Sequence, residues 1–225
     1  MKKYIDVLKR TGLFAGISQD EILIMLNCLG AQIKKYKKGE YVLRAGEFVN
    51  KITLLLEGKL LIQKEDYWGN RSIINAVEPG EMFGEAYSAP NSGALSNDVV
   101  AIEESAVLSF DLNKLLCTCP SSCRFHSLTI QNLFFTLCEK NRNLVKKIGI
   151  TSKRTTREKL TAYLSEEAKR QNKQSFEIPF NRQQLADYLC VDRSAMSNEL
   201  SKMRDDGLIE FDKNKFILLY NKKRT

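Results

Sequence analysis

Residues 181–211 read NRQQLADYLCVDRSAMSNELSKMRDDGLIEF. Asn181 and Gln184 have the spacing of a capping box, in which two side chains and two backbone N–H groups pair at the start of a helix. After a short turn, Asp192 can cap a second helix over residues 193–204. The stretch therefore predicts two short helices joined by a tight turn.

The second of these helices has two different faces. Helical spacing predicts an inward face made of Ala195, Met196, Leu200 and Met203. The outer face carries only small or forked polar groups, which are Arg193, Ser194, Ser197, Asn198 and Ser201. In the major groove of DNA, an arginine can bind a guanine edge and an asparagine can bind an adenine edge. The outer face is therefore typical of a helix that contacts DNA bases, and we expect Arg193 to bind a guanine.

Two apolar runs follow at 208–211 and 215–219, with turn residues between them. This pattern predicts a β-hairpin beside the two helices, as in a winged helix-turn-helix domain. An ordinary helical hairpin with a solvated polar face is the alternative interpretation.

Positive charge is concentrated in the same part of the chain. Residues 151–225 contain 16 Lys and Arg against 11 Asp and Glu, whereas residues 1–150 contain 19 against 16. The formal net charge of +8 is thus carried mostly by the last third of the 225 residues. Such an asymmetry indicates that one module contacts a polyanion.

The overall composition is that of an ordinary globular protein, with 43% hydrophobic and 28% charged residues. No apolar run approaches the ~18 residues that a membrane-spanning helix needs. The first residues include a charge within their short apolar stretch, unlike a secretory signal. We therefore expect a cytoplasmic protein with no membrane partner, whose six cysteines do not form structural disulfides.

The N-terminal half changes from a helical to a β pattern. Ser18 and Glu21 form another capping box ahead of a helical apolar repeat. From residue 37 to residue 111, short β-type runs alternate with glycine turns. This regular spacing predicts a β-sandwich or β-roll.

Residues 127–150 have a helical period and contain neither Gly nor Pro except Gly149. Heptad spacing places six residues on one seam, which are Ile130, Phe134, Leu137, Asn141, Leu144 and Ile148. A seam of this length predicts a two-stranded coiled coil, in which Asn141 fixes the register as a buried polar residue. A single amphipathic helix packed on its own domain is the alternative. Thr155 and Glu158 then form a capping box for the next helix.

Taken in order, these motifs resemble those of the cyclic-AMP receptor and fumarate–nitrate-reduction regulator (Crp–Fnr) transcription factors. The runs that carry the resemblance are 13–18 (LFAGIS), 36–40 (YKKGE), 56–60 (LEGKL), 79–85 (PGEMFGE) and 191–197 (VDRSAMS). The resemblance implies an α+β fold with three parts. They are an N-terminal cupin-like β-roll of the cyclic-nucleotide-binding type at 1–124, a long dimerisation helix and hinge at 125–150, and a C-terminal winged helix-turn-helix DNA-binding domain at 151–225.

The resemblance also implies a homodimer that binds a near-palindromic operator in double-stranded DNA and works with RNA polymerase. The residues expected to contact bases are Arg193, Ser194, Ser197 and Asn198. Arg182 matches a phosphate-contacting position of the family, and Lys202 is a further candidate phosphate contact. The family commonly has an acidic residue in place of Ser194 and often an arginine in place of Asn198, so its best-known operator sequences should not be assumed.

In relatives that bind cyclic nucleotides, a Gly-Glu pair binds the ribose, an Arg-Ser pair binds the cyclic phosphate, and hydroxyl residues of the long helix contact the base. The matching positions here are Gly84, Glu85, Leu95, Ser96, Leu137 and Cys138. Leu95 removes the guanidinium that would pair with the phosphate. We therefore expect an unidentified small effector other than cyclic AMP in a pocket formed by these residues, and an empty, constitutive roll is the alternative.

Three thiols lie close together before the long helix, at Cys117, Cys119 and Cys123, and the only histidine is His126. Free cysteine is an ordinary small apolar residue, so we expect a structural role for these three. Such a cluster can also sense redox change, which makes a thiol-sensing regulator of the same fold an alternative. Its spacing differs from the common C-x2-C motif, so no metal site is predicted.

A regulatory subunit and an enzyme are the two other classes of protein that a chain of this kind could represent. A cyclic-nucleotide-type regulatory subunit would share the β-roll but would not need a winged helix-turn-helix domain. An enzyme is not expected, because one histidine and the absence of a phosphate loop or a G-x-S-x-G motif leave no assembled catalytic set.

Overall fold

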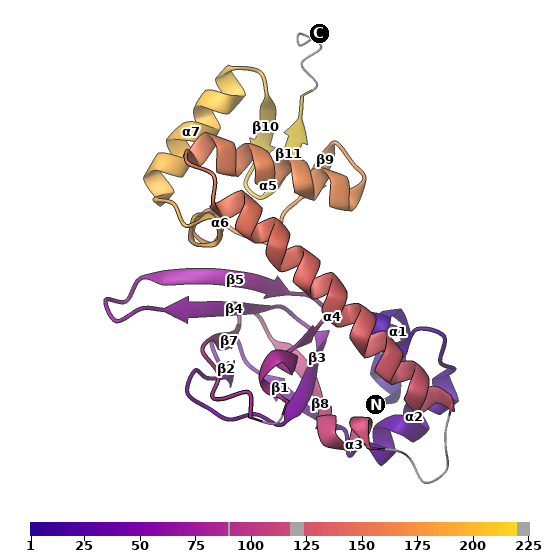
Figure 1. The fold of residues 1–225 in the computed structure, drawn as a ribbon. Coiled ribbons are helices and arrows are strands. Elements are labelled where there is room, and N and C mark those ends of the chain that lie inside the picture. Colours follow the sequence, from indigo (N-terminus) through magenta and orange to yellow (C-terminus); the bar gives the residue numbers. More distant parts are fainter. Residues whose placement is uncertain (90, 118–123, 220–225) are drawn as a thin grey trace. The chain divides into compact units, whose positions relative to one another are not determined.

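The computed structural model describes residues 1–89, 91–117 and 124–219, and the chain divides into two compact units. The first unit comprises Met1–Asn70 and Ile74–Asn141, and the second comprises Arg71–Ile73 and Arg142–Thr225. Runs of helices and runs of strands follow one another along the chain, as is typical of an α+β protein (Figure 1). The expected α+β class is therefore confirmed.

Short helices open the first unit. They are η1 (Lys2–Tyr4), α1 (Ile5–Arg10), η2 (Gly12–Phe14) and α2 (Gln19–Cys28). The capping box predicted at the start of α2 is present, because Ser18 Oγ accepts from the Glu21 backbone and the Glu21 carboxylate accepts from the Ser18 backbone. This exchange satisfies backbone groups that a helix start would otherwise leave unpaired.

A β-roll of two four-stranded sheets forms most of the first unit. One sheet has the order β1 (Gln32–Tyr36), β8 (Ser105–Asp111), β3 (Lys51–Glu57) and β6 (Met82–Phe83). The other has the order β2 (Tyr41–Leu43), β7 (Asp98–Ala101), β4 (Leu60–Glu65) and β5 (Arg71–Val77). Two short helices, η3 (Glu85–Tyr87) and α3 (Leu112–Leu116), follow β6 and β8. The predicted roll is thus confirmed.

Strand β3 is buried on both of its faces, which explains its unbroken apolar run. Successive strand residues point to opposite faces. Ile52 and Leu54 therefore belong to one apolar cluster, together with residues of α1 and α2. Leu55 points the other way into the interior of the roll, where it packs in a cluster with Val99 and Val107.

The turn between β3 and β4 requires glycine at position 58. Gly58 has a φ of +91°, and an added Cβ would lie 2.3 Å from both the Glu104 carbonyl oxygen and Ser105 Oγ. No other residue fits a left-handed backbone with so close a neighbour.

Helix α4 (Arg124–Thr151) is 28 residues long and contributes to both units. In the first unit it buries one face, which carries Thr129, Asn132 and Leu133. Asn132 Nδ2 donates to the backbone oxygens of Leu13 at 3.1 Å and Ala15 at 2.9 Å. The first part of α4 is therefore packed against the chain's own N-terminal segment.

The second unit combines helices with a three-stranded sheet. Its helices are α5 (Thr156–Gln171), α6 (Arg182–Leu189) and α7 (Arg193–Asp205). Its sheet has the order β10 (Ile209–Asp212), β11 (Lys215–Leu218) and β9 (Ser175–Glu177). The predicted capping boxes of α5 and α6 and the predicted hairpin of β10 and β11 are confirmed, and β9 adds a strand that the sequence did not predict.

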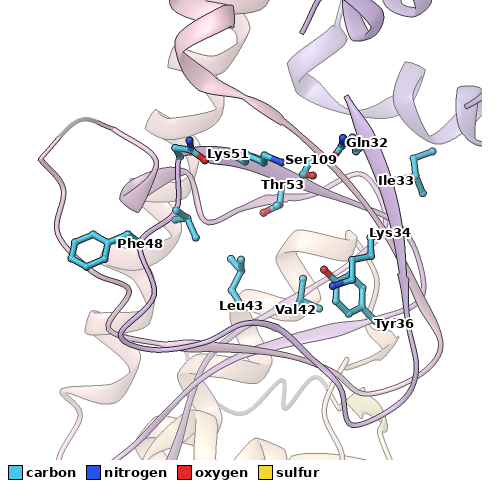
Figure 2. A pocket seen from close by; sticks show the side chains of 12 residues that line it. Gln32, Ile33, Lys34, Tyr36, Val42, Leu43, Phe48, Lys51, Thr53 and Ser109 are labelled. Atoms are coloured by element: carbon cyan, nitrogen blue, oxygen red, sulfur yellow. The ribbon is translucent and has the colours of Figure 1, made fainter. Parts of the chain in front are cut away.

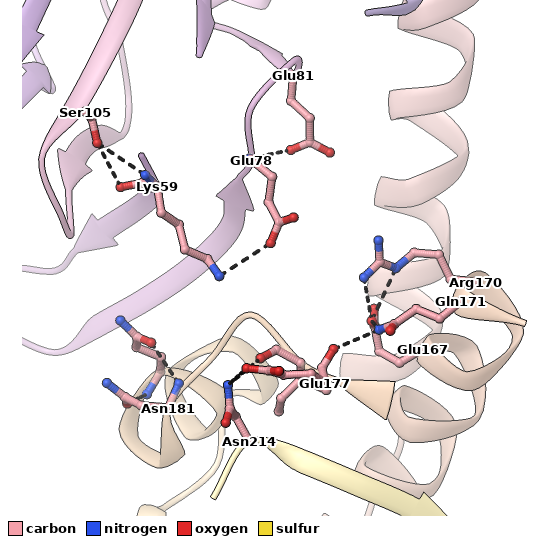
Figure 3. A network of polar contacts seen from close by, with 12 residues as sticks. Lys59, Glu78, Glu81, Ser105, Glu167, Arg170, Gln171, Glu177, Asn181 and Asn214 are labelled. Atoms are coloured by element: carbon pink, nitrogen blue, oxygen red, sulfur yellow. Dashed lines mark hydrogen bonds and ion pairs between the residues drawn. The ribbon is translucent and has the colours of Figure 1, made fainter. Parts of the chain in front are cut away.

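Polar side chains hold β9 between the end of α5 and the turn of the hairpin (Figure 3). Arg170 Nη2 donates to Glu167 at 2.8 Å, and Gln171 Nε2 donates to the Glu177 backbone oxygen at 2.8 Å. Asn214 Nδ2 donates to Glu177 Oε1 at 2.6 Å. These contacts give the three-residue strand its fixed place in the sheet.

Candidate functional site

Helices α6 and α7 are joined by a turn with one strained residue. Cys190 has a φ of +52°, in the left-handed region, and redirects the chain after α6. Asp192 then caps α7, because its carboxylate accepts from the Ala195 backbone N–H at 2.8 Å. The helix-turn-helix predicted from residues 181–204 is therefore present.

The inward face of α7 carries Met196, Leu200 and Met203, all fully buried in the second unit. Ala195 is exposed, so its predicted inward position is wrong. Successive helix residues are rotated by about 100° around the axis, and burial of Met196 turns Ala195 toward solvent. The Ala195 methyl group thus joins the outer face, where it could contact a thymine methyl group.

The outer face of α7 is open to a partner. Arg193, Ser194, Asn198 and Lys202 are exposed, and Ser197 is half-buried. In the part of the chain that the structure describes, no side-chain hydrogen bond or ion pair engages Arg193, Asn198 or Lys202. Their donors are therefore free to bind a nucleic acid.

Ser194 differs from these three residues, because its hydroxyl is already paired. Ser194 Oγ lies 2.5 Å from Asp192 Oδ1. This bond, followed by the Ala195 backbone N–H, holds the pKa of Asp192 below its ordinary value. The carboxylate that caps α7 is thus charged at neutral pH.

Arg182 is half-buried, whereas Lys202, the other predicted phosphate contact, is exposed. Its guanidinium stacks over the rings of Phe211 at 4.7 Å and Phe216 at 5.0 Å, both on the hairpin. Partial burial lowers the pKa of Arg182. Arg182 therefore also stabilises the packing of α6 on the hairpin through cation–π contacts.

The Gly84–Glu85 segment of the roll contacts α4 directly. Gly84 has a φ of +79° and starts η3. The Glu85 carboxylate pairs with Lys140 of α4, with Oε1 2.7 Å from Nζ, and Lys140 also donates to the Met82 backbone oxygen. Glu85 Oε2 is buried and has no hydrogen-bond partner among the described residues. One buried carboxylate oxygen therefore lacks a donor among the described residues.

The other predicted effector residues are more dispersed. Leu95 is buried and exchanges backbone hydrogen bonds with Gly46 and Glu47. Ser96 Oγ lies 2.5 Å from the hydroxyl of Tyr87 in η3. Leu137 and Cys138 are exposed on α4, within one helical turn of Lys140.

The predicted seam of α4 is exposed over most of its length. Phe134 is 62% exposed, Leu144 51% and Ile148 65%. Leu137 and Asn141 are also exposed, whereas Ile130 is half-buried and packs against the core of the first unit. The exposed apolar stripe therefore begins at Phe134 and extends to Ile148, beyond the buried residues Thr129, Asn132 and Leu133 of the same helix.

The cysteine cluster lies partly outside the described residues. Cys117 is an exposed free thiol, but Cys119 and Cys123 belong to the undescribed segment 118–123. Among residues 1–89, 91–117 and 124–219, no group of three or more His, Cys, Asp and Glu side chains is placed to hold a metal ion. No helix within these residues is long and apolar enough to cross a membrane.

Two family models match the chain in the expected order. The model for the cyclic nucleotide-binding domain matches residues 33–119, and the model for the Crp-like helix-turn-helix domain matches residues 158–224. The chain belongs to the Crp–Fnr family. The resemblance inferred from the sequence motifs is thereby confirmed.

Two curated relatives of this Crp–Fnr protein are each about one quarter identical to it over half of the chain. Human cGMP-dependent protein kinase 2 is 24% identical over 111 residues, which cover 49% of this chain and 14% of the kinase. A CRP-like cAMP-activated global transcriptional regulator from Mycobacterium tuberculosis is 26% identical over 110 residues, which cover 49% of this chain and 48% of the regulator. The match thus spans less than half of either relative's length.

A solved structure shares the fold over most of the chain. The c-di-GMP responsive global regulator CLP from Xanthomonas campestris has a TM-score of 0.70 and 15% identity, with 88% of this chain and 98% of that chain covered. At this identity, the likeness concerns the fold alone.

Two features of the Crp–Fnr site were not predicted from the sequence. Lys140, the partner of Glu85, is a single basic residue on a helix that has many, so its position gave no signal. Leu43 and Thr53 form the wall beside Gly84, at 3.1 and 3.3 Å from the place that its Cβ would take. The left-handed conformation common at a Gly-Glu pair could have indicated such a close approach.

Proposed function

We propose that this protein is a homodimeric, sequence-specific transcription regulator that binds a near-palindromic operator and responds to a small effector other than cyclic AMP. The outer face of α7 supports the DNA-binding part, because Arg193, Asn198 and Lys202 project unpaired donors from a capped helix. Two copies of α7 would enter successive major grooves, about 34 Å apart. RNA polymerase is the expected partner of the bound dimer.

The exposed stripe of α4 supports the dimer. Phe134, Leu144 and Ile148 are more than half exposed, although a monomer gains nothing from apolar groups in water. Pairing with a second α4 would remove this surface from water, and Asn141 at the centre of the stripe would favour a two-stranded arrangement.

The contact between Glu85 and Lys140 supports the effector response. An effector that shifts the Glu85 segment would alter its contact with Lys140, which lies on the helix that also carries the dimer seam. Effector binding would therefore change how the two α4 helices pair, and would redirect the DNA-binding domains through the hinge at residues 150–153. This is a population shift between two arrangements.

The test is a mobility-shift assay with the purified full chain and a DNA fragment from the promoter of its own gene. We expect sharp binding that weakens with salt, and much weaker binding to a scrambled fragment of equal length. Equal affinity for both fragments would contradict sequence-specific regulation. Calorimetry with cyclic AMP should give no binding at micromolar affinity, and such binding would contradict the proposed effector class.

A further inference from the structure

In the sheet formed by β1, β8, β3 and β6, the face that points into the roll changes from apolar to polar along the strands. Near one end it is apolar, with Leu55 of β3 and Val107 of β8 in the interior cluster. Near the other end the same face carries three polar residues in register across three strands, since Ser109 of β8 lies opposite both Gln32 of β1 and Thr53 of β3. Thr53 is buried, Ser109 is half-buried and Gln32 is exposed, so the polar row runs from the interior of the roll to its surface, where a ligand can reach it.

This polar row lines a pocket of about 730 Å³ (Figure 2). Val42 and Leu43 form an apolar wall opposite the row, and the ring of Phe48 stands at the edge of the pocket. The volume is within the range of pockets that hold small organic molecules. The pocket therefore offers apolar and hydrogen-bonding surfaces to one ligand.

Two lysines give the pocket its charge. Lys34 and Lys51 both line it, and the Lys34 ammonium lies 4.8 Å from the centroid of the Tyr36 ring. Neither ammonium has a carboxylate within ion-pair distance among the described residues. Asp111 is the register partner of Lys51, but its carboxylate accepts from the Asn113 backbone at 2.8 Å and caps α3. The pocket thus has two positive charges without a counter-ion.

We propose that this pocket binds an organic anion with an apolar body, such as a carboxylate on an aromatic ring. Lys34 and Lys51 would pair with the charged group, and Gln32 and Ser109 would donate hydrogen bonds, whereas the Thr53 hydroxyl already donates to the Phe83 backbone oxygen. Val42 and Leu43 would contact the apolar body. Charge-assisted hydrogen bonds of this kind select an anion over its neutral analogue.

The pocket also adjoins the segment that contacts α4. Leu43 and Thr53 belong to the pocket and also form the wall beside Gly84, the residue before Glu85. A ligand in the pocket would therefore press on the segment whose carboxylate binds Lys140. In this respect the inference names the chemical class of the effector, and its regulatory meaning rests on the function proposed above.

The test measures binding of 1-naphthaleneacetate and of its neutral amide, 1-naphthaleneacetamide, to the full chain by calorimetry. We expect the carboxylate to bind about tenfold more tightly than the amide. Lys34→Met and Lys51→Met should each remove most of this preference. Lys35→Met is the matched control, because its neighbouring position on β1 points to the opposite face of the sheet.

The outcomes separate the pocket from the proposed function. The proposal would be overturned if the carboxylate did not bind at millimolar concentration. It would also be overturned if Lys34→Met and Lys35→Met reduced the preference for the carboxylate equally. A mobility-shift assay with the same variants measures DNA binding separately from anion binding. A chain that binds DNA but not the anion contradicts the pocket alone, whereas a chain that binds the anion but no DNA supports the pocket and contradicts the regulator.

Discussion

The hydroxyl of Ser194 has two possible partners, and this limits its part in choosing bases. In the free chain it is bonded to Asp192, the residue that caps α7. A base contact from this hydroxyl would give up that bond, so its net gain is small. Arg193 and Asn198 have no such competing contact among the described residues, and we expect them to contribute more of the selectivity.

Replacing Arg193 by alanine should relax the preference for one guanine in each half-site. The loss of a bidentate contact to a guanine edge corresponds to ~1–3 kcal/mol of discrimination. A binding-site selection assay measures it. Lys202→Ala is the comparison, because loss of a phosphate contact weakens binding to all sequences alike and reduces the salt slope by about one. Unchanged selectivity in the Arg193 variant would exclude its predicted role.

Asp192 should make the stability of the second unit depend on pH in the acid range. Its pKa in the folded chain is lowered, first by the hydrogen bond from Ser194. The stabilisation is therefore complete above the ordinary carboxyl pKa, at about pH 4, and is lost as the pH falls through the lower folded value. The difference in unfolding free energy between the wild type and Asp192→Asn, measured in urea, should be full at pH 7 and should shrink as the pH falls below about 4. A difference that stays constant over this range would contradict the assignment.

Helix α4 illustrates how one element can satisfy two interpretations of its sequence. A packed amphipathic helix and a coiled-coil strand appeared as alternatives, yet Asn132 and Leu133 pack on the chain's own core while Phe134 to Ile148 present an exposed stripe. The packed residues thus precede the exposed stripe along α4, and each interpretation holds for its own part of the helix.

Introducing a negative charge into the stripe should separate the protomers of the proposed dimer. Ile148→Glu places a carboxylate on the 65%-exposed seam residue, where a partner helix would have to bury it. We expect sedimentation to show a monomer, with unchanged far-ultraviolet circular dichroism. Asn143→Glu adds the same charge to an exposed position away from the seam and should leave the oligomeric state unchanged. A dimer in the Ile148 variant would exclude this stripe as the interface.

The turn at Gly58 should tolerate no side chain. Gly58→Ala forces the backbone of Glu104 to move and is expected to lower the free energy of unfolding by about 3 kcal/mol or more. Gly39 has a similar φ of +86° but nothing within 4 Å of an added Cβ. Gly39→Ala should therefore cost only ~1–2 kcal/mol of backbone strain. Denaturant unfolding measures both variants. If Gly58→Ala and Gly39→Ala lost the same free energy of unfolding, the close approach at Gly58 would not contribute to stability.

Elements with a strong local signal could be predicted from the sequence, and weakly marked ones could not. The capping pairs Ser18–Glu21 and Asn181–Gln184 bond within four residues, so local spacing was sufficient. Strand β1 was missed because three of its five residues, QIKKY, are polar or charged, and because its partner β8 lies about 70 residues away. The pocket was missed for the same reason, since register across three strands brings its polar row together.

Effector binding and DNA binding can be coupled only through elements that both sites share. Within the first unit, the ion pair between Glu85 and Lys140 connects the roll to α4, and both side chains are less than one third exposed. An effector can break or strengthen such an ion pair, and so change how the roll holds α4.

A double-mutant cycle with Glu85→Gln and Lys140→Met should therefore give a coupling energy of ~0.5–3 kcal/mol in unfolding experiments. The operator affinity of Lys140→Met should also change, because the roll no longer holds α4 through Glu85. Lys146→Met removes a more exposed lysine of the same helix and should show no coupling with Glu85→Gln. Additive effects of Glu85→Gln and Lys140→Met would mean that the contact transmits nothing.

The unpaired stripe of α4 has a consequence for gene dosage. Where protomers of the proposed dimer are mostly separate, the amount of dimer follows the square of the protein concentration. A twofold change in expression would then alter operator occupancy about fourfold, until the operator is saturated. A chain whose helix leaves Phe134, Leu144 and Ile148 in water can therefore turn a graded change in its own abundance into a steeper transcriptional response.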